Sequence, residues 1–167
     1  MISRELVFGS SDQFEVLAVL QTGDHMVLSV QSRSEGCACP LCNMFSTKLH
    51  SYYFRKPKDL PAFDNKVSLR LRAKKWYCLN TQCIRKIFTE RFHHFFRPYQ
   101  RTTDRLREKL LNIAVLMGGR PGEKLCRTLH ISASSSSLIR IVHQQVVSNP
   151  SSVDAIGIDD SRIQERR

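Results

Sequence analysis

The sequence of 167 residues lacks any long apolar segment. Nothing in it approaches the roughly 18 uninterrupted apolar residues of a membrane-spanning helix. Residues 1–20 also lack the basic start and continuous apolar core of a secretion signal. These two absences predict a cytoplasmic protein that does not contact a membrane. Because cytoplasmic thiols stay reduced, we do not expect the six cysteines to form a disulfide framework.

Acidic side chains are scarce in the middle of the chain. Residues 37–150 contain six Asp and Glu against 21 Lys and Arg, whereas residues 1–36 contain five acidic and two basic side chains. Nearly all of the net charge of +11 therefore lies in the segment that begins with the cysteines. Such a localised positive field favours nucleic acid, because each neutralised phosphate releases counterions. A generally basic surface without a specific partner is the alternative.

Four cysteines form two close pairs that a basic, strand-like segment separates. Each pair can supply two thiolates from a tight turn, which is the arrangement that holds one tetrahedral structural Zn²⁺. With four thiolates, no coordination position remains open for a substrate. The predicted zinc ligands are Cys39, Cys42, Cys78 and Cys83.

The two remaining cysteines have other expected roles. Cys37 lies beside the first pair and could replace Cys39 as a ligand, although Cys39 and Cys42 have the usual spacing of a zinc-binding turn. Cys126 falls in an apolar helical pattern, so we expect it to be a small core residue.

Residues 66–74 alternate strictly between apolar and polar side chains, which is typical of a half-buried strand with one cationic face. Side chains on that face stand about 7 Å apart, comparable with the spacing of successive phosphates. Neighbouring aromatic residues favour a DNA contact over the alternative, a solvated outer face of a sheet. The predicted phosphate contacts are Arg55, Lys56, Arg70, Arg72, Lys74 and Lys75.

The other patterns predict a hairpin and a helical module. Segments 14–20 and 26–32 flank a turn signal and predict a β-hairpin, while apolar spacing predicts helices at 104–117, 122–129 and 134–147. The serine run at 134–137 could be a linker, but Ser134 is well placed as the N-cap of the last helix. The last two helices then form a helix-turn-helix whose residues near a major groove are Ser135, Ser136, Ile139 and Arg140.

In this order, the motifs resemble an insertion-sequence transposase of the ISL-three family, a DDE enzyme with an N-terminal zinc ribbon. The resemblance extends over essentially the whole chain and is specific as an ordered set. One departure is His130, at a turn position where the family tends to have glycine. Histidine can adopt the left-handed conformation at some energetic cost, so we still expect the turn. The matching residues include Cys39-Pro40-x-Cys42, Asp59-Leu60-Pro61, Leu69-Arg70-Leu71-Arg72, Trp76-x-Cys78-x4-Cys83, Phe88-x-Glu90-Arg91, Arg105-Leu106, Gly118-Gly119-Arg120 and Ile156-Gly157-Ile158-Asp159-Asp160.

The resemblance implies a function in DNA transposition. In the family, the zinc ribbon and helix-turn-helix recognise the terminal inverted repeats of a mobile element, and three carboxylates with two Mg²⁺ ions cut and rejoin DNA. The first carboxylate would be Asp159, but the sequence ends at Arg167. We therefore expect the DNA-binding portion of a truncated transposase, inactive in cleavage by itself. Its expected location is the cytoplasm, at the bacterial nucleoid, and its expected partners are double-stranded transposon ends and either further copies of itself or a full-length transposase.

The predicted fold class is α+β, with an N-terminal β-hairpin and a four-cysteine zinc ribbon followed by a helical helix-turn-helix module. The expected functional alternative is a zinc-ribbon and helix-turn-helix transcription regulator, or a general nucleic-acid binder. The expected boundaries are 1–36 for the hairpin, 37–92 for the zinc ribbon, 93–103 for a basic linker, 104–150 for the helix-turn-helix and 151–167 for the first strand of a truncated DDE domain.

Overall fold

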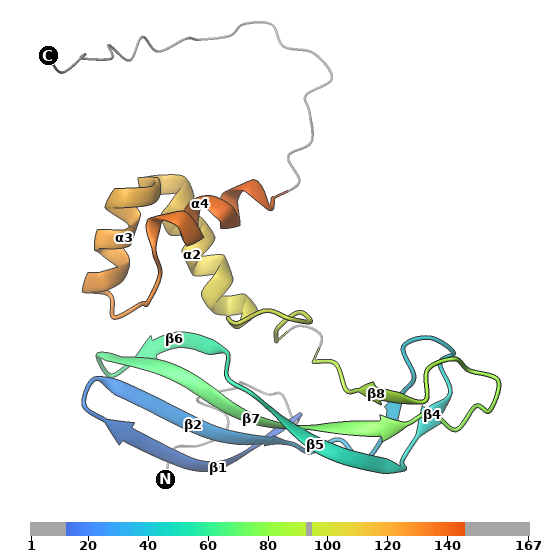
Figure 1. Cartoon of the computed structure of the whole chain (residues 1–167). Coiled ribbons are helices and arrows are strands. Elements are labelled where there is room, and N and C mark those ends of the chain that lie inside the picture. Colours follow the sequence, from blue (N-terminus) through green and yellow to red (C-terminus); the bar gives the residue numbers. More distant parts are fainter. Residues whose placement is uncertain (1–12, 93–94, 146–167) are drawn as a thin grey trace, which may run out of the picture.

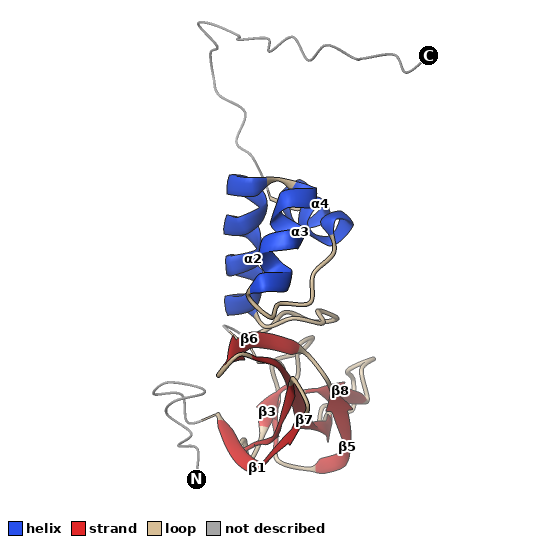
Figure 2. Cartoon of the chain, turned by 90° about the vertical axis from the view of Figure 1, so that its left-hand side faces the viewer, coloured by secondary structure: helices blue, strands red, loops and turns tan. Residues whose placement is uncertain are grey.

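The computed structural model describes residues 13–92 and 95–145. Strands form a twisted sheet and a small cysteine-bearing extension, and three helices pack together beyond β6 (Figures 1 and 2). This arrangement confirms the predicted α+β class with a zinc ribbon. None of the helices in the described ranges is long and apolar enough to cross a membrane.

The sheet is organised around one long strand, β7. This strand pairs with β2 and β8 on one side and with β5 and β6 on the other, and β1 pairs with β2. A separate two-stranded sheet joins β3 to β4. The strands are β1 (Phe14–Thr22), β2 (His25–Ser32), β3 (Cys37–Ala38), β4 (Phe45–Ser46), β5 (Leu49–Arg55), β6 (Lys58–Ala62), β7 (Asn65–Tyr77) and β8 (Ile87–Thr89).

Strand β7 follows the alternation of its sequence. Val67, Leu69, Leu71 and Ala73 are buried, and they pack with apolar residues of β1 and β2. The predicted hairpin is present as β1 and β2, with Gly23 at positive φ in its turn, where glycine carries no steric cost. Its second strand pairs in parallel with β7, so the hairpin and the segment between the cysteine pairs share one sheet.

Aromatic residues that follow β8 cover the buried face of this sheet. Phe92 and Phe96 are buried in the same core as Leu69 and Leu71, and Phe14 packs against the Phe92 ring at 5.1 Å between centroids. The segment expected to be a basic linker thus contributes part of the core of the sheet. Burial of large aromatic side chains explains why this segment is fixed against β7.

The three helices are α2 (Asp104–Met117), α3 (Gly119–Thr128) and α4 (Ser135–His143). Thr103 caps α2 and Ser134 caps α4, each accepting a hydrogen bond from a backbone N–H three residues later. The serine run is therefore the start of a helix in the described structure. Helix α3 begins three residues before the expected 122, because Pro121 needs no N–H partner in a first helical turn.

Close packing between α3 and α4 depends on small residues. A Cβ atom added at Gly122 would lie 3.0 Å from a methyl group of Leu138, and one added at Gly119 would lie 3.0 Å from Ile139. The turn between these helices places His130 in the left-handed region at φ 56°, which the sequence analysis expected at some energetic cost. Cys126 is fully buried in the core of this module, as expected from the helical pattern.

A buried carboxylate joins the helical module to the sheet. Asp59 on β6 accepts hydrogen bonds from the Thr103 hydroxyl at 2.7 Å and from Arg105 Nε at 2.7 Å. A second bond from Arg105 makes the contact bidentate. The backbone of Lys58 also exchanges hydrogen bonds with the residues just before α2, and Leu60 packs against the helical core. The start of α2 is therefore fixed to β6.

Candidate metal centre and nucleic-acid interface

Two turns at one end of the sheet carry the four predicted zinc ligands. The first turn joins β3 to β4, where the N–H of Cys39 donates to the Met44 carbonyl and Asn43 adopts a positive φ of 57°. The second turn joins β7 to β8, where the N–H of Cys83 donates to the Asn80 carbonyl. Each turn thus holds two thiols on one side of the backbone.

The four Sγ atoms of Cys39, Cys42, Cys78 and Cys83 all lie within 4.8 Å of one another. Those of Cys42 and Cys78 are 3.5 Å apart. Sulfur atoms bound at about 2.3 Å to a tetrahedral Zn²⁺ are roughly 3.8 Å apart, so these residues fit the metal. Cys37 packs beside the group but is not part of it, because its side chain is directed toward the Ala38 carbonyl.

The thiols of this cluster influence one another electrostatically. Desolvation raises the pKa of Cys78 to about 12, and the neighbouring thiols of Cys42, Cys39 and Cys83 act in the same direction. Desolvation also acts to raise the pKa of Cys39, but the backbone N–H groups of Cys42 and Leu41 outweigh it and lower this pKa to about 7. N–H donors directed at sulfur favour thiolates, which are the form that binds Zn²⁺.

A small apolar cluster supports the metal site. Trp76 and Phe88, paired across β7 and β8, are buried together with Cys39 and Cys83. Trp76 thus packs beside the four cysteines. The short strands around the cysteines offer little other apolar surface to bury, so the metal completes the core of this end of the molecule.

The predicted cationic face of β7 carries two stacked guanidinium–aromatic pairs. The Arg70 guanidinium lies over the Phe54 ring at 5.0 Å, and that of Arg72 lies over Tyr52 at 3.8 Å. Lys74 is nearer the metal site, where its Nζ donates to the Ser34 carbonyl at 2.6 Å. Stacking holds each guanidinium by its face and leaves N–H groups at its edge that can reach a phosphate.

The other predicted contacts of the sheet lie elsewhere. Arg55 pairs with Leu71 on the core-facing side, stacks on Phe96 at 4.2 Å and donates to the Gln100 carbonyl. The Lys75 ammonium group lies over the Tyr53 ring and does not continue the row formed by the Arg70 and Arg72 pairs. Lys56 is exposed in the connection between β5 and β6.

The predicted contacts of the last helix gather at its first two turns. Ser136 and Arg140 are exposed, whereas Ser135 is half-buried and its N–H donates to the Glu123 carboxylate at 3.1 Å. Leu138 and Ile141 face the helical core, which leaves this side of α4 open. The expected apolar residue Val146 and the expected carboxylate Asp159 lie outside the described residues.

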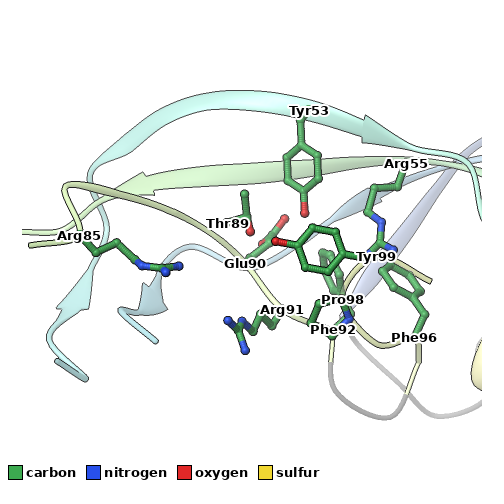
Figure 3. A pocket seen from close by; sticks show the side chains of 10 residues that line it. All are labelled: Tyr53, Arg55, Arg85, Thr89, Glu90, Arg91, Phe92, Phe96, Pro98 and Tyr99. Atoms are coloured by element: carbon green, nitrogen blue, oxygen red, sulfur yellow. The ribbon is translucent and has the colours of Figure 1, made fainter. Parts of the chain in front are cut away.

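A pocket that the sequence analysis did not anticipate lies beside β8 (Figure 3). Arg85 and Arg91 are on the side of this pocket away from Arg55, and Glu90 lies between them. Glu90 accepts hydrogen bonds from the Ser32 hydroxyl and the Lys74 N–H, and burial raises its pKa. The only sequence signal for this site is the basic, aromatic character of residues 84–103, which does not show which side chains converge.

Comparison with known proteins identifies one part of the chain. Residues 35–83 match the family model described as the zinc-finger of transposase IS204/IS1001/IS1096/IS1165. No curated protein and no solved structure matches the chain. The matched segment contains both cysteine pairs and the cationic strand between them. The family match and the geometry of the four thiols together support a zinc ribbon of the transposase type at residues 35–83.

Proposed function

We propose that this chain is the DNA-binding portion of an insertion-sequence transposase and that it recognises the terminal inverted repeats of its element. The observation that carries the proposal is the transposase-type zinc ribbon, because its matched residues include both the metal cluster and the cationic face of β7. Zn²⁺ is structural in this proposal. It holds two turns that are distant in sequence, and four thiolates leave no open position for chemistry.

Arg70 and Arg72 supply the phosphate contacts of the zinc ribbon. Both are on the face of β7 that is not packed into the core, and each is held by an aromatic ring of β5. A pre-positioned guanidinium loses less side-chain freedom on binding a phosphate than a free one. These contacts position the protein on DNA and carry no sequence information.

Sequence recognition is assigned to the helical module, with α3, the turn at His130 and α4 acting as a helix-turn-helix. The first turns of α4 expose Ser136 and Ile139, short and apolar side chains that can contact base edges and thymine methyl groups in a major groove. The connection through Asp59 fixes this module to the ribbon, so both can bind one duplex with a defined spacing.

The experiment that tests the proposal is the selection of duplexes from a random DNA pool by the zinc-loaded protein at physiological salt. We expect enrichment of one motif that matches repeats flanking the gene. Binding to all duplexes without enrichment would contradict end recognition and favour a general nucleic-acid binder. Enrichment of a motif found at promoters and absent from element ends would favour the second candidate, a transcription regulator with the same two modules.

A second measurement tests the phosphate contacts. The double variant R70A/R72A should bind every duplex more weakly, with a salt dependence of affinity flatter by about two units. The control K109A/K124A removes the same charge from exposed positions of α2 and α3. Equal slopes for the two variants would exclude this face of β7 as the phosphate contact.

A further inference from the structure

Four cations from four different segments line one cleft between the helices and the chain that precedes them. The cleft has a volume of about 810 Å³ and is bounded by residues 98–102, α2 and α4. The cations come from β6, from the connection, from α2 and from α4. They are Lys58, Arg101, Arg107 and Arg140.

The cations of this cleft are not neutralised within the part of the chain that the structure describes. None of the described residues that line it is acidic, and in the described part of the chain none of its four cations forms an ion pair. Two of them have neutral partners: Lys58 Nζ donates to the backbone carbonyl of Ser132, and Arg107 donates to the side-chain amide oxygen of Gln144. Folding thus gathers like charges, which is unfavourable unless an anion occupies the cleft.

Tyr99 stands at the rim of the cleft in an unusual conformation. Its backbone is in the left-handed region at φ 63°, although it is not a glycine, and its side chain is 99% exposed. The residue also lines the pocket of Figure 3, so the two cavities share it. Strain at an exposed aromatic residue is found at sites that clamp a ligand.

We propose that this cleft binds the sugar-phosphate backbone of duplex DNA next to the bases that α4 contacts. Arg101, Arg107 and Arg140 bind phosphates, and the Tyr99 ring packs against an adjacent sugar. This inference rests on the proposed DNA-binding function. It also changes one expectation from the sequence, because Arg140, which we expected near a major groove, lies in the cleft and contacts the backbone.

The test uses the zinc-loaded full chain and a short duplex of the selected sequence, with a random duplex beside it. R101A/R107A should bind both duplexes roughly 10- to 50-fold more weakly near physiological salt, with the salt slope lowered by about two units. The matched control is again K109A/K124A, because Lys109 is on the same helix as Arg107 but lines a different groove. A variant that keeps the affinity and slope of the control would overturn the proposal.

Two further variants separate the possible causes of a lost affinity. Because Arg107 also holds Gln144, R101A/R107Q keeps a polar side chain at that position, and zinc content and melting temperature show whether the fold is intact. Y99N removes the aromatic ring and introduces asparagine, a residue that tolerates the left-handed region. It should weaken binding about 3- to 10-fold without changing the salt slope, since no charge is lost. An unchanged affinity would remove Tyr99 from the site.

The binding measurements distinguish an error in this inference from an error in the proposed function. If the wild-type chain binds no duplex, both are contradicted. If it binds with normal salt dependence and R101A/R107A behaves as the control does, only the cleft is excluded. R140A adds a direct comparison: a uniform loss on both duplexes supports a backbone contact, whereas a loss confined to the selected sequence supports a base contact and contradicts the proposal.

Discussion

The cysteine end of the sheet and the helical module are stabilised in different ways. Around the cysteines, β3 and β4 have two residues each, and the buried cluster consists of Cys39, Trp76, Cys83 and Phe88. The helical module buries six residues from its three helices and Ile131 from the turn before α4, and it needs no metal ligand among them. Elements too short to bury a core require a cross-link, and here the four thiols can provide it through Zn²⁺.

This difference predicts that the two regions unfold independently of each other. Stability of the cysteine end depends on thiolate charge and metal supply, whereas stability of the helical module depends on packing volume. The sheet lies between the two regions, and the helical module contacts it at β6 through Asp59, Lys58 and Leu60. Variants at the metal site, in the helical core, at the junction and in the sheet core can therefore test the comparison in turn.

Loss of a zinc ligand should have the largest effect. C78S removes one of the four thiolates, and structural Zn²⁺ sites contribute about 10–16 kcal/mol of apparent binding free energy at neutral pH. We expect loss of zinc and unfolding of β3, β4 and the cysteine turns, while amide signals of α2, α3 and α4 remain. Metal analysis and residue-resolved NMR measure the two effects.

The matched control replaces the cysteine of the helical module. C126S should retain one zinc per chain, because Cys126 is buried among helical residues away from the metal cluster. A C78S protein that also kept its zinc would show that Cys78 is not a ligand.

A cavity in the helical core should have the opposite consequence. Leu138 is fully buried and contacts the region of Gly122, so L138A should lower the free energy of unfolding of the helical module by about 2–5 kcal/mol. Zinc content should stay at one per chain. I139A is the control, since Ile139 is 48% exposed on the same helix. Loss of zinc on L138A would mean that the two regions fold as one unit and would contradict the comparison.

Local patterns in the sequence predicted much of each region. The alternation at residues 66–74 predicted β7 and its buried face, and the cysteine spacing predicted the group that the structure brings together. Ser134 as an N-cap and the left-handed turn at His130 were also expected. These features depend on side chains within a few positions of one another, which is the range over which hydrophobic period and capping chemistry act.

Long-range pairing could not be predicted in this way. The parallel pairing of β2 with β7 joins residues about 40 positions apart, and no local period encodes such a register. The Asp59–Arg105 pair and the cleft at Arg101 and Arg107 have the same origin, because each combines segments whose separate patterns are unremarkable. The position of α3 was misjudged by three residues because Pro121 was treated as preceding the helix.

Breaking the junction should have an intermediate effect. D59A removes the acceptor of the Thr103 and Arg105 hydrogen bonds, and we expect a loss of about 1–3 kcal/mol because the remaining Arg105 side chain is 40% exposed and can be solvated. Thermal unfolding should separate into two transitions, one sensitive to chelator and one not. The control D64N removes an exposed acid in the β6–β7 turn and keeps a residue that tolerates the left-handed φ of 56° at that position. A single, unshifted transition in D59A would show that this contact does not couple the regions.

The smallest predicted effect concerns the pH dependence of the sheet core. Burial raises the pKa of Glu90 above its usual 4.5, although the Lys74 N–H and the Ser32 hydroxyl oppose the shift. A carboxyl whose folded pKa is raised contributes stability that is present below its unfolded pKa and is lost as pH rises through its folded value. E90Q keeps an oxygen for the Lys74 N–H and removes the titration, so its stability relative to wild type should increase as pH rises from the usual carboxyl pKa of 4.5 through the higher pKa of the folded state. Urea unfolding of both zinc-loaded proteins across this range measures the difference, in which any common effect of zinc release cancels. Parallel curves would show that the carboxylate is as well stabilised in the fold as in water, and pH sensitivity would then belong to the cysteine end alone.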